Sequence, residues 1–183
     1  MKKLRIARDG YILISIAFYI AAVIYMLVLG LQPQVVCLVS GVVLIAYGII
    51  KIIGFFSKDL YCLAFQYDLA MGTLLILLGA AVLFFNTRIA VHLPFGLGWL
   101  ALLDSLLKIQ MSKDAKEFGL EKWNAILGIA LVTAVLSLLL IFKRFSNPRT
   151  AHIIVGCALF AEGLMNHCTV RYTVRRMKTS DPA

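Results

Sequence analysis

Ionisable and polar side chains recur at one spacing inside long apolar stretches of this sequence. In three stretches the pairs stand four residues apart: Tyr47 with Lys51, Asp104 with Lys108, and Glu162 with Asn166. Residues four apart share one face of a helix. An ionisable group within lipid is costly and is by default a candidate for function. These six residues are therefore the candidate intramembrane polar cluster.

Two roles are open to this cluster. Glu162 is the deepest carboxylate of the expected spans, and it could accept a proton. Alternatively, Lys51 and Lys108 could neutralise Asp104 and Glu162 across helices, so that the cluster acts as polar glue between them. Asp68, at the start of its expected helix, is interpreted as a favourable charge at a helix N-terminus.

Known signatures of enzymes do not occur in the sequence. We find no Ser/His/Asp-type constellation, no phosphate-binding glycine loop and no helix with zinc-ligand spacing. The cysteines, Cys37, Cys62, Cys157 and Cys168, have no ligand spacing and no pattern of a disulfide framework. We therefore expect no enzymatic activity, no catalytic residues, no cofactor and no metal site.

The elements that must position the cluster are apolar helices. Of 183 residues 62% are hydrophobic and 15% charged, and the mean hydropathy is +0.93, so lipid must cover much of the chain. Apolar runs of about one membrane crossing each are Tyr11–Leu31, Val35–Phe55, Tyr67–Phe85, Ile89–Lys108, Asn124–Phe142 and Ala151–Val170. Such runs form helices because lipid offers no hydrogen-bond partner to backbone N–H and C=O groups. The sequence predicts one all-α membrane domain, residues 1–183, with six transmembrane helices.

Lysine and arginine residues predict the orientation. Fourteen fall on one side of the predicted bilayer, and four, Arg88, Lys143, Arg144 and Arg149, on the other. The fourteen are Lys2, Lys3, Arg5, Arg8, Lys51, Lys58, Lys108, Lys113, Lys116, Lys122, Arg171, Arg175, Arg176 and Lys178. The positive-inside rule places them, together with both termini, in the cytoplasm. The expected location is the inner or plasma membrane of the cell.

The formal charge of +9 raises the question of a polyanionic partner. The basic residues lie at helix ends and in short loops without a nucleic-acid-binding motif, so we expect no nucleic-acid partner. The expected partner is the bilayer, with anionic lipids at the cytoplasmic face. Tyr11, Tyr61, Tyr67, Trp123 and Tyr172 are expected to be interfacial anchors. Trp99, in mid-span, is expected to pack between helices.

Small residues recur in register with the cluster, at offsets of 57 and 58 residues. The predicted helix-packing residues are Gly41, Gly48, Gly72, Gly79, Gly98, Ser105, Gly156 and Gly163. Gly72 and Gly79 match Ser15 and Ala22 in the first span, whereas the fifth span keeps Gly128 but has Val135 at the second position. Small residues seven apart allow close approach of helices. The register predicts three tandem helical hairpins, at about 11–55, 67–108 and 124–170.

The hairpins also carry a resemblance. It rests on Gly41…Tyr47-Gly48-Ile49-Ile50-Lys51, Gly98…Asp104-Ser105-Leu106-Leu107-Lys108 and Gly156…Glu162-Gly163-Leu164-Met165-Asn166. From about Tyr11 to Tyr172 the chain resembles the HdeD family of bacterial inner-membrane proteins. The resemblance implies a multi-pass protein that contributes to acid or envelope stress tolerance, and it carries over no catalytic residues.

Two further functions remain open at this point. One is a small transporter or channel for protons, ions or small solutes, which predicts a polar path outward from the cluster. The other is a membrane scaffold or assembly protein that binds partner helices through its glycine faces. A homo-oligomer or a partner membrane protein is compatible with either.

Overall fold

The computed structural model describes residues 2–28, 32–57, 65–85, 88, 92–142 and 148–174. Predictions that concern other parts of the chain lie outside the described residues. They include the predictions for Tyr61 and Cys62, and those for the basic side chains at positions 2, 3, 58, 143, 144, 175, 176 and 178.

Six α-helices make up the regular structure of the described residues. They are α1 (Lys2–Leu27), α2 (Pro33–Phe55), α3 (Asp68–Phe84), α5 (Leu93–Glu117), α6 (Trp123–Phe142) and α7 (Pro148–Thr173). Four of them, α1, α2, α6 and α7, are long and apolar enough to cross a membrane, and α3 is a shorter apolar helix. The predicted all-helical class is confirmed.

Helix α5 differs from its predicted bounds at both ends. It begins at Leu93, with Pro94 in its first turn, where a missing amide proton costs little. It ends at Glu117 and so continues past Lys108, into the stretch expected to be a loop. This last turn packs onto α6, because Met111 and Ala115 are buried with Ile126.

Gly119 stops α5. Its backbone has φ 71°, which disfavours residues with a Cβ. The Gly119 amide donates to the Lys116 carbonyl and the Leu120 amide to the Ala115 carbonyl, both at 3.0 Å. This pair of bonds is the Schellman motif that closes many helices.

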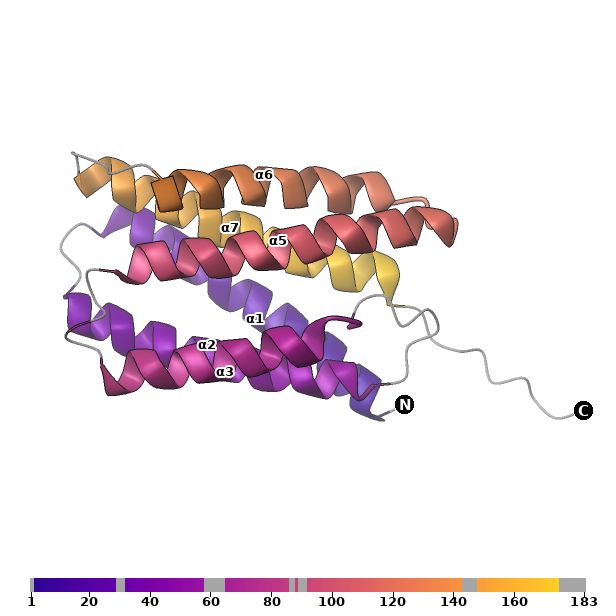
Figure 1. Ribbon diagram of the computed structural model, residues 1–183, viewed down its shortest axis with the longest axis horizontal. Coiled ribbons are helices and arrows are strands. Elements are labelled where there is room, and N and C mark those ends of the chain that lie inside the picture. The colour runs from indigo at the N-terminus through magenta and orange to yellow at the C-terminus, as the bar shows by residue number, and fades with distance from the viewer. Residues whose placement is uncertain are drawn as a thin grey trace, which may run out of the picture.

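The helices associate in three close pairs: α2 with α3, α5 with α6, and α7 with α1. Each pair joins the second helix of one predicted hairpin to the first helix of the next, and α7 returns to α1. In Figure 1, α5, α6 and α7 lie on one side of the bundle and α2 and α3 on the other, with α1 crossing obliquely. We call the end where α1 begins and α7 ends the basal end.

Glycines allow the α2–α3 pair to approach closely. A Cβ on Gly48 would lie 2.6 Å from the Gly72 carbonyl oxygen, and one on Gly41 would lie 3.1 Å from that of Gly79. Even an alanine methyl has no room at the first of these positions. The predicted packing role of these four glycines is consistent with this geometry.

The same contacts recur in the other two pairs. A Cβ on Gly156 would lie 3.0 Å from the Ala22 carbonyl oxygen, and one on Gly163 would lie 3.1 Å from that of Ser15. In the α5–α6 pair, a Cβ on Gly98 would lie 3.3 Å from the Ser137 carbonyl oxygen. Predicted packing residues of α5 and α7 thus face the neighbouring hairpin.

The small residues that pack α6 stand two positions after Gly128 and Val135, the positions noted in the sequence. Gly128 has no atom within 4 Å of a would-be Cβ, and Val135 is 57% exposed. Ala130 and Ser137, two residues further on, are buried. Two residues rotate a helix by about 200°, so this small shift moves the packing face to the opposite side of α6.

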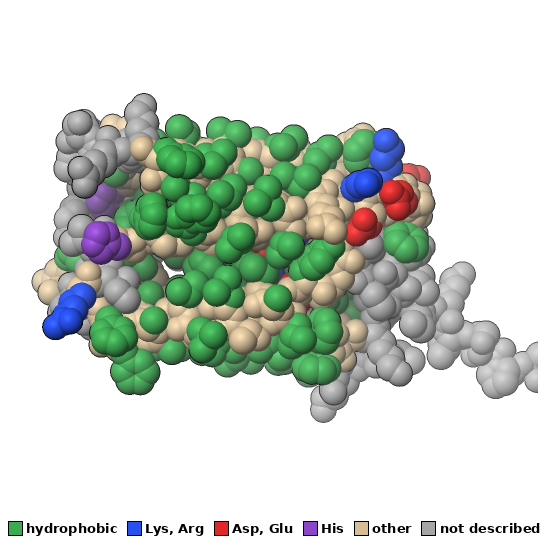
Figure 2. All heavy atoms as spheres, in the orientation of Figure 1, with side chains coloured by type: hydrophobic (Ala, Val, Ile, Leu, Met, Phe, Trp, Pro, Cys, Tyr) green, Lys and Arg blue, Asp and Glu red, His purple; other side chains and the backbone are tan. Residues whose placement is uncertain are grey.

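On the face drawn in Figure 2, apolar side chains are spread over the outer surface between the ends of the bundle. Trp99 belongs to this surface: it is 45% exposed beside Phe95, and the prediction that it packs between helices is wrong. Trp123 and Tyr172 lie at the basal end, where the Lys116 ammonium is 4.8 Å from the centre of the Trp123 ring. An outer surface with this many exposed apolar side chains is typical of a lipid-facing bundle.

Candidate functional site

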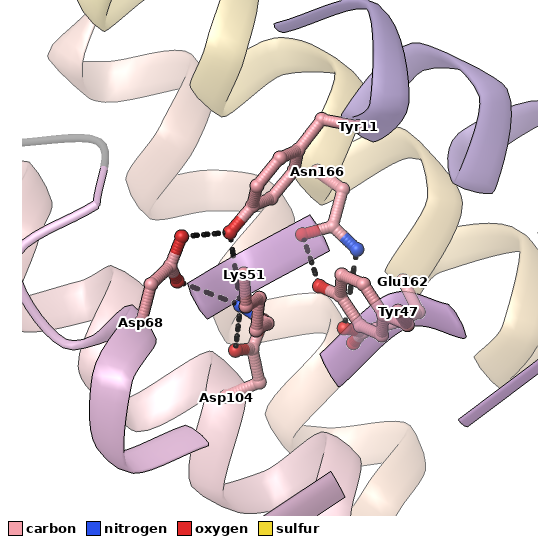
Figure 3. A network of polar contacts seen from close by, with 7 residues as sticks. All are labelled: Tyr11, Tyr47, Lys51, Asp68, Asp104, Glu162 and Asn166. Atoms are coloured by element: carbon pink, nitrogen blue, oxygen red, sulfur yellow. Dashed lines mark hydrogen bonds and ion pairs between the residues drawn. The ribbon is translucent and has the colours of Figure 1, made fainter. Parts of the chain in front are cut away.

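Lys51 stands at the centre of a buried polar cluster (Figure 3). Its fully buried ammonium lies 3.1 Å from Asp68 Oδ1 and 3.0 Å from Asp104 Oδ1. The same ammonium donates a hydrogen bond of 3.3 Å to Tyr11 Oη. Tyr11 Oη in turn donates to Asp68 Oδ2. One lysine on α2 thereby joins α1, α3 and α5.

A second group of contacts connects α2 to α7. Tyr47 Oη donates to Asn166 Oδ1 at 2.8 Å, and Asn166 Nδ2 donates to Glu162 Oε1 over a longer 3.4 Å. The Tyr47 ring also lies beneath Lys51, with the ammonium 4.8 Å from the ring centre. The tyrosine ring therefore lies between the cationic part of the cluster and the Glu162 part.

Lys108 does not have the role predicted for it. It is buried, but it makes no ion pair with any residue that the structure describes, and its ammonium lies 5.9 Å from the centre of the Tyr11 ring. Asp104 therefore has Lys51 as its ion-pair partner, and no lysine of the described residues makes an ion pair with Glu162. The ion pairs across helices form at Lys51, whereas Lys108 contributes only its nearby charge.

Two fully buried carboxylate oxygens near a central cavity have no hydrogen-bond donor among the described residues. They are Asp104 Oδ2 and Glu162 Oε2, on side chains that are 3% and 6% exposed. Both residues line a partly open cavity of about 50 Å³. A water molecule needs roughly 10–15 Å³ on such a measure, so the cavity has room for a few waters, although the two oxygens themselves are fully buried.

Polar residues continue from the cluster toward the basal end. On α7, Thr169 and Thr173 follow Glu162 and Asn166 on one helix face, and both are fully buried. Thr169 Oγ1 has no hydrogen-bond partner among the described residues. On α5, Ser112 is buried one turn beyond Lys108. In the opposite direction, the cavity wall is apolar.

Sequence reasoning missed two members of the cluster. Tyr11 was expected at the membrane interface but is fully buried, and Asp68 was expected as a simple helix N-terminal charge but is buried against Lys51. Asp68 does lie in the first turn of α3, so its position was predicted and its partner was not. A signal was present, because Tyr11 and Asp68 stand 57 residues apart, in the register of the small residues.

Comparison with known proteins gives one match. The family described as a short repeat of unknown function (DUF308) matches residues 13–84 and again residues 70–142. The chain belongs to the DUF308 family. This is the family domain of HdeD-like membrane proteins, so the resemblance stated above is supported at that level. No curated protein and no solved structure matches the chain.

The two DUF308 matches carry the register seen in the helices. Their first residues are 57 apart and their last residues 58 apart. Both matches include α3, once as the last helix of a match and once as the first. Each DUF308 match therefore contains one close pair, α2–α3 or α5–α6. Family membership and the apolar helices together indicate a membrane protein.

Proposed function

We propose that the protein is a non-enzymatic, six-span inner-membrane protein of the HdeD type that contributes to acid tolerance by binding a proton in its buried cluster. The observation that carries this proposal is the pair of buried carboxylate oxygens, Asp104 Oδ2 and Glu162 Oε2, that have no hydrogen-bond donor among the described residues. Both termini and the basal end face the cytoplasm, where most of the basic residues lie.

Charge balance supports a proton at this site. Among the described residues, the buried charged side chains are three carboxylates and two lysines: Asp68, Asp104, Glu162, Lys51 and Lys108. With all five ionised, the interior carries one net negative charge. An uncompensated charge in a low-dielectric interior is costly, and one proton removes it.

Glu162 is the proposed proton-binding residue. The groups that face it are Asp104 and Lys108 from α5, Tyr47 and Lys51 from α2, and Asn166 on its own helix, with Tyr11 and Asp68 behind Lys51. Asp68 and Asp104 each have Lys51 as a direct counter-ion, whereas Glu162 has only the amide of Asn166. A proton is therefore best placed on Glu162 or shared with Asp104.

Access to the site supports a cytoplasmic source of protons. Buried hydroxyl groups of Ser112, Thr169 and Thr173 extend from the cluster toward the basal end. Away from that end, Leu44, Leu97 and Val155 line the cavity. A transporter needs polar access from both sides, so a site that binds protons from the cytoplasm fits this arrangement better than a channel.

The proposal is tested by Glu162→Gln, which keeps the shape of the side chain and removes its titration. In bacterial cells that depend on the chain for survival, we expect the variant to lower acid survival and slow the recovery of cytoplasmic pH. Its membrane level should equal that of the parent. Glu117→Gln, an exposed carboxylate at the end of α5, is the matched control and should behave as the parent does.

A direct measurement completes this test. Infrared difference spectra of the purified protein between neutral and acidic pH should contain a carboxylic-acid band that Glu162→Gln removes and Glu117→Gln leaves. Parental acid survival and an unchanged band in Glu162→Gln would together overturn the proposal.

A further inference from the structure

We infer that the central cavity binds the end of a phospholipid acyl chain, which enters it sideways from the bilayer between α3 and α5. The ligand is uncharged and uses the apolar wall of the cavity, not the buried carboxylate oxygens of the proton site. The inference therefore stands or falls independently of acid tolerance.

The middle hairpin is open on the side of the bundle where α3 and α5 lie. The first predicted hairpin packs α1 against α2 and the third packs α6 against α7, whereas the described parts of α3 and α5 do not pack along each other. Figure 2 shows a hollow on this side, between α5 and the α2–α3 pair, with apolar side chains around it. The second hairpin is therefore open where its two counterparts are closed.

Contacts close this opening at both of its ends. At the end opposite the basal end, Val82 of α3 and Leu93 of α5 belong to one buried apolar cluster. Toward the basal end, the two ion pairs of Lys51 join α3 to α5, and Gln66 Nε2 donates to Asp114 Oδ2 at 3.0 Å. The opening is thus a window part-way along the two helices, which we call the α3–α5 window.

The cavity behind the α3–α5 window lies at the depth where acyl chains end. Its wall includes Leu44 and Leu75, which stand midway along α2 and α3. Helix α2 has 23 residues and so spans about 34 Å, close to the roughly 30 Å of hydrocarbon in a bilayer. Its midpoint therefore lies near the bilayer midplane, where the chains of the two leaflets meet.

The wall of the cavity suits an alkyl chain. Its accessible surface is almost wholly apolar, with contributions from Phe18, Met71, Leu97 and Ala101. A water molecule needs two to four polar partners, so a cavity lined in this way favours an apolar guest. An empty cavity would also forfeit the dispersion contacts of its wall, and a chain end restores them.

Cavity size limits the ligand to the end of a chain. A volume of about 50 Å³ corresponds to roughly three to five water molecules. Such a space accepts the last few carbon atoms of an unbranched chain and excludes a lipid headgroup. The headgroup of the bound lipid therefore stays at the membrane surface.

The test uses the full chain in phosphatidylcholine vesicles with a tracer of phosphatidylcholine that carries a diazirine at the end of one acyl chain. Light releases N₂ from the diazirine, the resulting carbene inserts into neighbouring C–H bonds, and mass spectrometry of peptides locates the adducts. We expect adducts on the buried wall residues Met71 and Leu75 as well as on the outward-facing Leu77 and Leu106. Adducts confined to outward-facing residues would overturn the inference.

A filled cavity should lose only the labelling of the wall. Ala101→Leu extends into the cavity and should reduce adducts on Met71 and Leu75 at least fivefold, with the outward-facing leucines labelled as in the parent. Ala80→Leu, at a half-buried α3 alanine outside the wall, is the matched control and should match the parent throughout. Parental labelling of the wall in Ala101→Leu, with its elution on size exclusion unchanged, would contradict the site.

An enlarged cavity should have the opposite effect. Leu97→Ala removes part of the wall next to the α3–α5 window and should raise the labelling of Met71 and Leu75 at least twofold. This variant adds no bulk to the core, so it tests the site even if Ala101→Leu fails to fold. Unchanged or lower wall labelling in folded Leu97→Ala would count against the inference.

Competition identifies the source of the chain. Phospholipid chains outnumber all others at the midplane, so unlabelled palmitate at one-tenth of the phospholipid should leave the wall labelling by the tracer nearly unchanged. Loss of that labelling would make a free fatty acid the preferred occupant and would overturn the phospholipid assignment.

The outcomes also separate this inference from the proposed function. Loss of acid survival in Glu162→Gln, together with adducts confined to outward-facing residues, would keep the proton role and reject the acyl-chain site. Wall labelling that Ala101→Leu removes, together with parental acid survival and an unchanged infrared band in Glu162→Gln, would establish the acyl-chain site and reject the proton role.

Discussion

Lys51 contacts both Asp68 and Asp104 in the buried interior of the bundle. An ion pair of this kind is costly to form, because three charged groups lose their hydration. Removing one partner costs still more, since the remaining charges keep no counter-ion. The stability of the bundle therefore depends more on Lys51 than on any exposed charge.

Lys51→Met tests this dependence. Methionine matches the length of the lysine stem but leaves Asp68 and Asp104 without their shared cation, so we expect a loss of about 3–5 kcal/mol in unfolding free energy. Thermal unfolding in detergent measures the loss. Lys113→Met, at an exposed position on α5, should change stability little, and equal effects of the two variants would contradict the central role of Lys51.

Tyr11→Phe tests the hydrogen bond between α1 and α3. The substitution keeps the ring against Phe65 and Tyr47 but removes the donor to Asp68, and hydrogen bonds to charged groups contribute about 1.5–3 kcal/mol. Unfolding of the variant should begin at a lower temperature than that of the parent. Tyr19→Phe, two turns along α1, should unfold as the parent does.

The sequence predicted the cluster only in part, for identifiable reasons. Tyr47, Lys51, Asp104, Glu162 and Asn166 do lie together, because equal register on neighbouring helices sets equal depth. Register does not set the rotation of each helix, so it could not determine which of the two lysines meets Asp104. Tyr11 and Asp68 lie near the ends of predicted spans, where a polar residue has a simpler interpretation.

At the scale of helices, close approach between hairpins is the main packing feature. Gly48 and Gly72 on α2 and α3 face each other's carbonyl oxygens, and Gly163 faces that of Ser15 on α1. In lipid, no hydrophobic effect drives helices together. This close contact therefore stabilises the pair through van der Waals attraction. The sequence predicted these faces because glycine is the only residue that permits the contact.

Gly48→Ala and Gly128→Ala form a matched pair for this feature. A methyl at Gly48 meets the Gly72 carbonyl oxygen at 2.6 Å, and overpacking of this kind costs about 1–3 kcal/mol. A methyl at Gly128 meets nothing within 4 Å, and alanine favours the helix by up to about 1 kcal/mol. Melting temperatures should fall for the first variant and hold or rise for the second.

The buried face of α6 allows a second test of packing. Ser137→Leu places a large side chain on the buried face that meets Gly98, so we expect a destabilised protein and a reduced membrane level. Val135→Leu, on the exposed face, should be tolerated. The opposite ranking would place Val135, and not Ser137, on the packed face of α6.

At the scale of the molecule, the three close pairs surround a central, partly open cavity. The predicted hairpins follow one another along the chain, yet each helix packs most closely against a neighbouring hairpin. The offset of 57 and 58 residues predicted this regularity, and the DUF308 matches share it. The sequence did not indicate which helices pack most closely. The loops are long enough for each helix to pack either within its own hairpin or against the neighbouring one.

Orientation in the membrane is tested by labelling with a membrane-impermeant maleimide. His92→Cys, at the end of the bundle opposite the basal end, should react in intact cells, whereas Glu117→Cys should react only after permeabilisation. The positive-inside distribution is the physical reason for this expectation. Reaction of Glu117→Cys in intact cells would place the basal end outside.

The contact between α1 and α7 has a consequence for synthesis. The ribosome synthesises α1 first and α7 last. Ser15 and Ala22 therefore stay uncovered in the bilayer until α7 has been inserted. During that interval, nascent chains expose a backbone groove that other helices could occupy. A translational stop before α7 would therefore yield an unsealed intermediate, a natural target for membrane proteases.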